Sequence, residues 1–525
     1  MTLLKMRAVI LRTFVVESAT KNLSVSPTGR LFARRPVRRA KSDARCQGVR
    51  WPAVTAGFFV LALAVTLPVV AAGSAEPMRP NILFVLADDL GWGDVGYHGS
   101  RALTPTIDRL AAQGLELRQH YVTPQCTPTR VALMTGRYPS RFDALVATNA
   151  PAFPADTLTL ARAFKQAGYQ TFLSGKWHLG FDPGHRPWEM GFDHSYGSLS
   201  GAVHPWQHTY RKGELERTWH RNGERLNEPG WSATELVTRE AERFVRLPHD
   251  QPWFMYVAHF AVHTPVDAPD RFKRLYPGSL ADDPEIDDDM RRYFAFTSQL
   301  DDSVARLLDA LMETKQLDDT LVVFASDNGP LGFWPGGGQG KAYGEPLVTS
   351  KWAGDSGGLR GRKATPYEGG IRTPAFVYWK GRLEGRRVDR PIHVVDWFPT
   401  LTSLAGYTPA GDEKWDGQDI WPLLEGRAAA SRTLYWKYGG GMGALRDGDL
   451  KLVVMGQSDW ARGMMPGENR SDQLFDLARD PRETTNLSAD QPETVARLRA
   501  LMREIAKDDE LGRIFKVGDQ SYWTP

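Results

Sequence analysis

Ile82-Leu83-Phe84-Val85-Leu86-Ala87-Asp88-Asp89 is the stretch of sequence that decides the fold of this chain. Six consecutive apolar residues are typical of a strand that is buried on both faces, as in a parallel sheet. A second such run, Thr320-Leu321-Val322-Val323-Phe324-Ala325-Ser326, ends in Asp327-Asn328. We therefore expect both runs to form strands of one sheet, with polar side chains after each carboxyl end.

Helical patterns alternate with the predicted strands. One amphipathic pattern starts at Thr104-Pro105 and stops at Gly114, and a second covers residues 158–167. Proline in the first turn and glycine after the last are the expected helix boundaries. A third helix is predicted over 294–311, and further strands are predicted over 169–173 and 253–260. This alternation predicts an α/β fold with a large mixed, mostly parallel sheet sandwiched by helices.

The sequence pattern changes after about residue 427. Short strand-like runs at 433–437 and 451–455 precede a helical run at 493–505. We therefore expect a main domain over residues 79–427 and a smaller C-terminal α+β domain, with an antiparallel sheet and a helix, over residues 428–525. Residues 329–358 are rich in Gly, Pro and Trp, which predicts a long surface loop.

Residues 1–75 form a predicted presequence. The stretch from Trp51 to Ala75 has no charged residue, follows a basic region and ends in small residues. This pattern is typical of a secretory signal cleaved after Ala72 or Ala75. An uncleaved anchor is the alternative, because about 20 apolar residues can span a bilayer. We expect a periplasmic or secreted protein that contacts a membrane only through an uncleaved presequence.

The formal net charge of +3 is unevenly distributed along the chain. Residues 1–75 hold 12 Lys and Arg against 2 Asp and Glu, so the remainder is acidic. The basic charge therefore belongs to the presequence, which argues against a nucleic-acid-binding surface.

Only two cysteines occur, and Cys46 lies in the predicted presequence. A single remaining thiol excludes an intramolecular disulfide and a cysteine-rich zinc site. Cys126 opens the run Cys126-Thr127-Pro128-Thr129-Arg130. A helix starting here would place Cys126 and Arg130 on one face, near its positive end. The thiol is then either a buried structural residue or part of a reactive site.

Two acidic pairs follow predicted strands, and their carboxylate and amide oxygens suit Ca²⁺ or Mg²⁺ rather than zinc. The candidate ligands are Asp88, Asp89, Asp327 and Asn328. Basic and imidazole side chains follow other strands and loops, namely Lys176, His178, His263 and Lys363. Taken singly, each has a simpler interpretation as a turn residue, a satisfied core or surface histidine, or a solvated cation.

Together these motifs resemble those of the sulfatase family, from about Pro80 to the C-terminus. The matching blocks are 88–94, 126–136, 168–178, 359–363 and 367–370, and they are most similar to the arylsulfatase B-type subgroup of the alkaline phosphatase superfamily. Residues 446–452 and 474–481 resemble the family's C-terminal domain. The resemblance implies an alkaline-phosphatase-like sheet and a sulfatase catalytic domain over residues 79–427.

The resemblance implies that a formylglycine-generating maturation enzyme oxidises Cys126 to Cα-formylglycine, whose hydrate is a geminal diol. One diol hydroxyl would attack sulfur and release the alcohol, and the second would then collapse to the aldehyde and expel sulfate. It further implies a divalent cation, Ca²⁺ in preference to Mg²⁺, bound together with residue 126. The implied ligands are Asp88, Asp89, Cys126 in its converted form, Asp327 and Asn328.

The resemblance also implies roles for the basic side chains. Arg130 and Lys176 would stabilise the diol, and His178 would take the proton that starts sulfate release. The implied substrate-binding residues are Lys176, His263 and Lys363. His263 is the candidate for protonating the leaving oxygen, and Asp327 for activating the nucleophile.

Two features depart from the family pattern. Thr129 stands where serine is commoner, and the segment between Asn328 and Lys363 is longer and contains Lys341 and Lys351. The second departure concerns substrate fit more than catalysis.

The expected substrate is a sulfate monoester, either an aryl sulfate or a sulfated sugar or glycan. Trp206, Trp334 and Trp352 are candidates for stacking on sugar rings, and His204 and His208 for the pocket. A phosphonate monoester or phosphodiester hydrolase of the same superfamily is the alternative enzyme. A non-catalytic sulfated-glycan-binding protein is a third hypothesis, against which the intact set of reactive residues argues.

Overall fold

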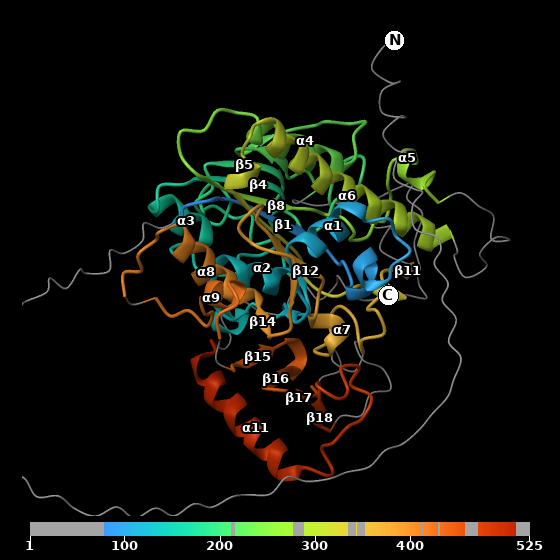
Figure 1. Ribbon diagram of the computed structural model, residues 1–525, viewed down its shortest axis with the longest axis vertical. Coiled ribbons are helices and arrows are strands. Elements are labelled where there is room, and N and C mark those ends of the chain that lie inside the picture. The colour runs from blue at the N-terminus through green and yellow to red at the C-terminus, as the bar shows by residue number, and fades with distance from the viewer. Residues whose placement is uncertain are drawn as a thin grey trace, which may run out of the picture. The chain divides into compact units, whose positions relative to one another are not determined.

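A computed structural model of the chain describes residues 78–211, 216–276, 288–333, 343, 352–411, 413–428, 431–456 and 471–510 (Figure 1). The predicted presequence with Cys46, and also Trp334, Lys341 and Lys351, lie outside the described residues. Within the described residues, none of the helices combines the length and the apolar character needed to cross a bilayer.

The main sheet has ten strands among the described residues, in the order β13-β2-β12-β9-β1-β8-β4-β5-β6-β7. Their bounds are β1 Asn81–Ala87, β2 Leu115–Leu117, β4 Gln170–Lys176, β5 His194–Ser198, β6 Trp219–Arg221, β7 Glu224–Arg225, β8 Trp253–Ala258, β9 Thr320–Ser326, β12 Ala375–Tyr378 and β13 Arg386–Val388. The inner strands β9, β1, β8, β4 and β5 are parallel, whereas β12, β6 and β7 pair in antiparallel fashion. The predicted mixed, mostly parallel sheet is confirmed.

Strand β1 shows why the sheet is covered on both faces. Ile82, Phe84 and Leu86 belong to one hydrophobic core, whereas Leu83 and Val85 belong to the other. Burying each such side chain contributes about 1.5–3 kcal/mol. The first core includes α2 Cys126–Thr135, α3 Leu160–Gln166 and α8 Trp397–Leu404, and the second includes α1 Pro105–Gln113, α4 Ala233–Val245 and α6 Asp288–Glu313 (Figure 1).

Two predicted helices differ from the observed ones at their first turn. Helix α3 begins two residues later than predicted, because the hydroxyl of Thr159 accepts a hydrogen bond from the backbone N–H of Arg162 and caps the helix. Helix α6 begins at Asp288, before the predicted start at residue 294. Its first turn is acidic, which favours a helix N-terminus but hides the apolar pattern.

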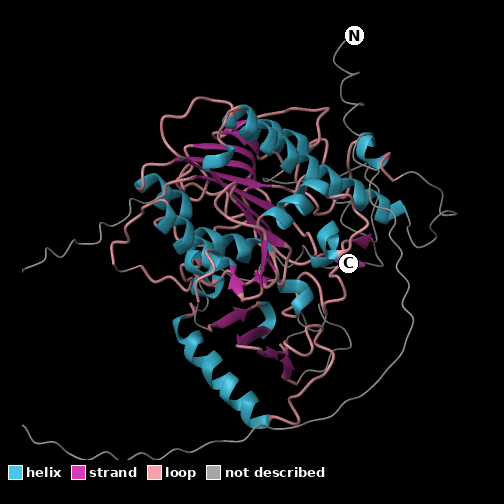
Figure 2. Cartoon of the chain, viewed as in Figure 1, coloured by secondary structure: helices cyan, strands magenta, loops and turns pink. Residues whose placement is uncertain are grey.

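The C-terminal domain contains a four-stranded antiparallel sheet in the order β15-β16-β17-β18. Figure 2 shows these strands, labelled in Figure 1, with a long helix beside them. The elements are β15 Thr433–Lys437, β16 Gly443–Asp447, β17 Leu450–Val454, β18 Gln473–Asp476 and helix α11 Pro492–Ile505. Leu445, Leu452 and Leu474 form a core with Leu498 of α11. The opposite face packs on the main domain, since Trp436 and residues 364–371 share another core. The predicted smaller α+β domain is confirmed.

Several short strands and α-helices also occur among the described residues. They are β3 His120–Tyr121 paired with β14 Ile392–His393, β10 Gly332–Phe333 paired with β11 Trp352–Ala353, and the short helices α5 Asp270–Lys273, α7 Glu368–Ile371 and α9 Trp421–Leu424. The predicted loop over 329–358 lies mostly outside the described residues, and its described ends pair as β10 and β11.

Candidate active site

The candidate site lies where the central parallel strands end. Asp88 and Asp89 follow β1, Asp327 and Asn328 follow β9, and Lys176 is the last residue of β4. His263 follows β8 by five residues. Because β9, β1, β8 and β4 are parallel neighbours, their carboxyl ends meet at one edge, where ligands of open α/β sheets bind.

Helix α2 begins at Cys126, as predicted, and the thiol is 2% exposed. Arg130 lies one turn later and is fully buried. Its guanidinium donates to Oδ2 of Asp327 at 2.8 Å, to the carbonyl of Lys176 at 3.2 Å and to the hydroxyl of Tyr256 at 3.1 Å. Arg130 therefore connects the start of α2 to the ends of β9 and β4.

Two lysines form ion pairs with Asp88 and Asp89. The Nζ atom of Lys176 lies 2.6 Å from Oδ2 of Asp88, and both side chains are fully buried. The Nζ atom of Lys363 donates to both carboxylate oxygens of Asp89, at 2.6 and 2.9 Å. Nε2 of His263 lies 3.7 Å from Oδ2 of Asp89. These contacts join residues that are up to 274 positions apart in sequence.

The second acidic pair contacts the first. The amide nitrogen of Asn328 donates to Oδ1 of Asp89 at 2.7 Å, and the backbone N–H of Asp89 donates to Oδ1 of Asp327 at 3.2 Å. Asp89 has a φ of 62°, a left-handed conformation that few residues other than glycine adopt without strain. The chain thus reverses sharply after β1, and this turn directs the carboxylate of Asp89 back toward the strand ends.

Burial and neighbouring charges shift the titration of the two aspartates in opposite directions. Burial, together with the negative charge of Asp327, raises the pKa of Asp88 to about 8. Burial also opposes ionisation of Asp89, but Lys363 and His263 outweigh it and lower the pKa of Asp89 to about 2. Asp88 therefore holds a proton at neutral pH unless a cation binds there, whereas Asp89 is ionised.

The two histidines of the site are held as neutral imidazoles. Burial, helped by Lys176, lowers the pKa of His178 well below its usual value. Burial, helped by Lys363, lowers the pKa of His263 to about 3. Burial likewise raises the pKa of the Cys126 thiol, against the influence of both lysines. A neutral imidazole can accept a proton, as a general base requires.

The site fits a hard divalent cation. Oδ1 of Asp88 and Oδ1 of Asn328 are buried without a hydrogen-bond partner among the described residues. Ligand atoms of Asp88, Asp89 and His263 lie within 4.8 Å of one another. Unpartnered buried oxygens are unfavourable unless a cation or a water binds them, and oxygen donors suit Ca²⁺.

Two residues that contact the site were not predicted from the sequence. Tyr256 binds Arg130 but lies inside an apolar strand run, where its hydroxyl was the sole signal of a buried polar partner. Gly201 lies directly against the ring of His178. A Cβ atom added at this glycine would lie only 2.4 Å from Nε2 of the ring. Its sequence context of small residues gave no indication of this contact.

Several pocket candidates have other partners. Nδ1 of His204 accepts the backbone N–H groups of Trp206 and Gln207, and Nε2 of His208 contacts the carbonyl of Trp231. Trp352 packs edge-on against Tyr293 and Phe294 of α6, an arrangement typical of core packing. The indole N–H of Trp206 donates to Asp267 at 2.7 Å.

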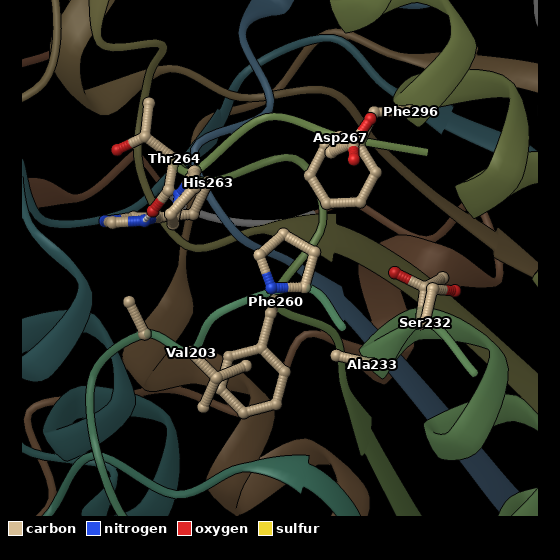
Figure 3. A pocket seen from close by; sticks show the side chains of 12 residues that line it. Val203, Ser232, Ala233, Phe260, His263, Thr264, Asp267 and Phe296 are labelled. Atoms are coloured by element: carbon tan, nitrogen blue, oxygen red, sulfur yellow. Dashed lines mark hydrogen bonds between the residues drawn. The ribbon is translucent and has the colours of Figure 1, made fainter. Parts of the chain in front are cut away.

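Asp267 also lines a small pocket beside His263 (Figure 3). The labelled wall of this pocket has four apolar residues, Val203, Ala233, Phe260 and Phe296, and four polar ones, Ser232, His263, Thr264 and Asp267. The pocket therefore borders His263 from the side of α4 and α6.

Comparison with known proteins agrees with this geometry. The family model described as Sulfatase matches residues 80–407. The chain belongs to the sulfatase family. Mouse arylsulfatase J is 33% identical over 81% of this chain and 76% of its own length, and human N-acetylgalactosamine-6-sulfatase is 30% identical over 82% and 86%. The chain is accordingly a sulfatase that hydrolyses sulfate esters, which excludes the non-catalytic hypothesis.

Solved structures show the same relationship. A crystal structure of Ps i-CgsB in complex with k-i-k-neocarrahexaose has a TM-score of 0.70 and 28% identity, covering 82% of this chain and 94% of that chain. The PsFucS1 sulfatase from Pseudoalteromonas sp. has a TM-score of 0.66 and 25% identity, covering 82% and 90%. A phosphonate monoester hydrolase of Agrobacterium radiobacter has a TM-score of 0.54 at 20% identity, and that similarity concerns the fold alone.

Proposed function

We propose that this sulfatase removes sulfate from a sulfated sugar, with a formylglycine hydrate at position 126 as the nucleophile. The convergence of charge around Cys126 carries the proposal. Three buried cations, Arg130, Lys176 and Lys363, surround the start of α2, each paired with a strand-end aspartate. Such an arrangement stabilises the negative charge that develops on a transferring sulfuryl group.

Each side chain has a role in this proposal. Lys176 and Arg130 stabilise the ionised diol, while Lys363 and His263 hold the sulfate oxygens. His178, neutral because it is buried, accepts the proton of the second hydroxyl as sulfate is expelled. His263 protonates the leaving alcohol oxygen after the negative charge of the bound sulfate has raised its pKa from the low value it has here.

We also propose that Ca²⁺ is the resident cation, as it generally is in this family. Asp88, Asp89, Asp327 and Asn328 would hold it, together with the converted residue 126. When bound, it supplies Lewis-acid polarisation of the sulfate oxygens. The unpartnered Oδ1 atoms of Asp88 and Asn328 support this assignment, because each offers a free oxygen lone pair in a buried site.

The similar proteins support a sugar substrate. One relative is named N-acetylgalactosamine-6-sulfatase, and one solved structure holds k-i-k-neocarrahexaose. The secretory pattern of residues 51–75 supports a periplasmic or secreted location. Conversion of Cys126 requires a formylglycine-generating maturation enzyme in the host.

Mass spectrometry of the peptide that carries Cys126, isolated from the native host, tests the nucleophile. Formylglycine has the mass expected for loss of the thiol and gain of an aldehyde, and it forms hydrazones. An unmodified thiol in protein that turns over substrate would overturn the assignment. Comparing turnover of an aryl sulfate with that of an aryl phosphodiester tests the reaction class, and a strong phosphodiester preference would favour the alternative hydrolase.

Calcium binding can be tested without turnover. Isothermal titration of Ca²⁺ into chelator-treated protein should show one tight site, and the Asn328→Ala variant should weaken it. Equal affinity of that variant would contradict the assignment of Asn328. The Asn149→Ala variant is the matched control: the amide oxygen of Asn149 accepts the backbone N–H of Gly201 instead, so this variant should retain Ca²⁺ affinity.

A further inference from the structure

We propose that Glu483 and Lys451 of the C-terminal domain are positioning residues that hold Lys363 against Asp89. The inference rests on the proposed function, in which Lys363 binds the substrate sulfate. It concerns the segment of residues 359–371, here named the Lys363 segment, which lies between the main sheet and the C-terminal sheet.

The inner side of the Lys363 segment binds the main domain. The backbone N–H of Lys363 donates to the carbonyl of Pro330 at 2.8 Å, and that of Ala364 donates to the carbonyl of Pro124 at 2.7 Å. Pro124 lies two residues before Cys126. The side chain of Lys363 then reaches both carboxylate oxygens of Asp89. The position of this segment therefore decides where the lysine ammonium lies.

The outer side of the segment binds the C-terminal domain through charge. Oε2 of Glu483 accepts the backbone N–H of Glu368 at 2.7 Å, and its backbone carbonyl accepts the guanidinium of Arg360 at 2.8 Å. Nζ of Lys451 lies 2.9 Å from Oε1 of Glu368 and 2.9 Å from Oε1 of Glu483. Glu368, Lys451 and Glu483 are all fully buried.

Buried charges of this kind fix geometry strongly. Removing Lys451 would leave two buried carboxylates without the cation they share, and removing Glu483 would leave the backbone N–H of Glu368 without its acceptor, whereas an apolar contact tolerates sliding. Glu368 also accepts the hydroxyl of Tyr121 at 2.8 Å, so both of its carboxylate oxygens are bound. Few arrangements of the segment can satisfy all these partners together.

A short, internally bonded turn connects this anchor to Lys363. The backbone N–H of Gly369 donates to the carbonyl of Arg360 at 2.6 Å, and that of Thr365 donates to the carbonyl of Arg362 at 3.0 Å. Lys363 and Glu368 are therefore parts of one compact unit, and a shift at Glu368 moves Lys363. Misplacing an active-site group by about 1 Å lowers the rate by roughly 100-fold.

The test compares Glu483→Gln with Asp509→Asn as a matched control. Asp509 is also a buried carboxylate of the C-terminal domain, bound to Arg141 at 3.0 Å and Lys437 at 3.2 Å, but it does not contact the Lys363 segment. Both variants should melt at lower temperature than the wild type. E483Q alone should lower kcat of the folded enzyme, by about 10- to 100-fold, with a smaller change in KM.

Two readouts distinguish positioning from general stability. Amide hydrogen exchange of the peptide covering residues 359–371 should accelerate in E483Q and remain unchanged in D509N. In a Lys363→Ala background, E483Q should cause little further loss of kcat, because its effect acts through the missing lysine. Equal amide exchange of this peptide in E483Q and D509N would overturn the proposal. So would a kcat of the double variant that is lowered by the product of the two single losses.

A second variant and the exchange comparison cover the cases in which E483Q does not fold or the wild type is inactive. If E483Q does not fold, Glu483→Asp retains the charge, shortens the reach by one methylene and should give the same pattern in weaker form. If the wild type turns over no sulfate ester, the proposed function fails, while the exchange comparison still decides whether Glu483 holds the Lys363 segment.

Discussion

Substituting Gly201 with alanine should displace the ring of His178. The added Cβ atom would lie 2.4 Å from Nε2, 2.5 Å from Cε1 and 2.9 Å from Cδ2 of that ring. Ordinary contacts between such atoms are about 3.5–4.0 Å, so the imidazole must move by roughly 1 Å. The backbone of His178 cannot follow easily, because it has a φ of 58° and its N–H is bound to the carbonyl of Leu199.

A displacement of this size at the proposed proton acceptor should lower kcat by about 100-fold, equivalent to about 2.7 kcal/mol in activation free energy. Overpacking should also lower the free energy of unfolding by about 1–3 kcal/mol. Initial rates with an aryl sulfate, normalised to folded and converted protein, measure the first effect. Urea denaturation measures the second.

Gly443→Ala provides the control for overpacking alone. Its Cβ would lie 2.6 Å from the carbonyl oxygen of Trp436 and 2.8 Å from Cε of Met502, inside the C-terminal sheet. G443A should lose stability but retain kcat. The double variant G201A/H178A should be no slower than H178A, because the ring that Gly201 positions is then absent. A G201A enzyme with wild-type kcat would refute the reasoning.

The remaining predictions concern the nucleophile, a buried ion pair and pH. Cys126→Ala should abolish turnover while leaving the melting transition cooperative, since the change removes one buried sulfur atom; retained activity would contradict the role of residue 126. Arg130→Met leaves Asp327 unpaired and should lower the free energy of unfolding, measured by urea denaturation, by about 3–5 kcal/mol. The control Arg243→Met, at an exposed arginine paired with Glu240, should change it by less than about 1 kcal/mol. Burial lowers the pKa of His259 to about 3, so as the pH falls below 6.5 the unfolded chain takes up a proton there that the folded chain does not. This group alone should lower the free energy of unfolding by up to about 1.4 kcal/mol per pH unit, in addition to other buried histidines such as His178 and His263. His259→Gln should reduce that slope, and an unchanged slope would show that another group titrates.

Much of the fold could be predicted because buried parallel strands have a distinctive composition. The runs at 82–87 and 321–325 are apolar throughout, and both lie in central strands. The polar residues after them converge for a topological reason, since parallel neighbours end at one edge. Helix starts were less accurate where the first turn is acidic, as at Asp288, because the apolar period is absent there.

The contacts within the site could not be predicted in the same way. The sequence placed Asp88 and Asp89 near basic residues, but nothing in it shows that Lys176 selects the first and Lys363 the second. Such pairings depend on the turn after β1 and on a segment more than 270 residues later. Glu483 was missed because its partners are a backbone N–H and two side chains that meet only when both sheets are assembled.

The burial of Cys126 also determines when its proposed conversion can take place. Helix α2, which begins at Cys126, packs against the sheet in which β1 pairs with β9. Because β9 lies about 200 residues after Cys126, the thiol is enclosed only after those residues have been made. At typical ribosomal speed this interval lasts roughly 10–40 s. Under the proposed conversion, the maturation enzyme would act on the growing or unfolded chain, and faster folding would leave more of the protein unconverted.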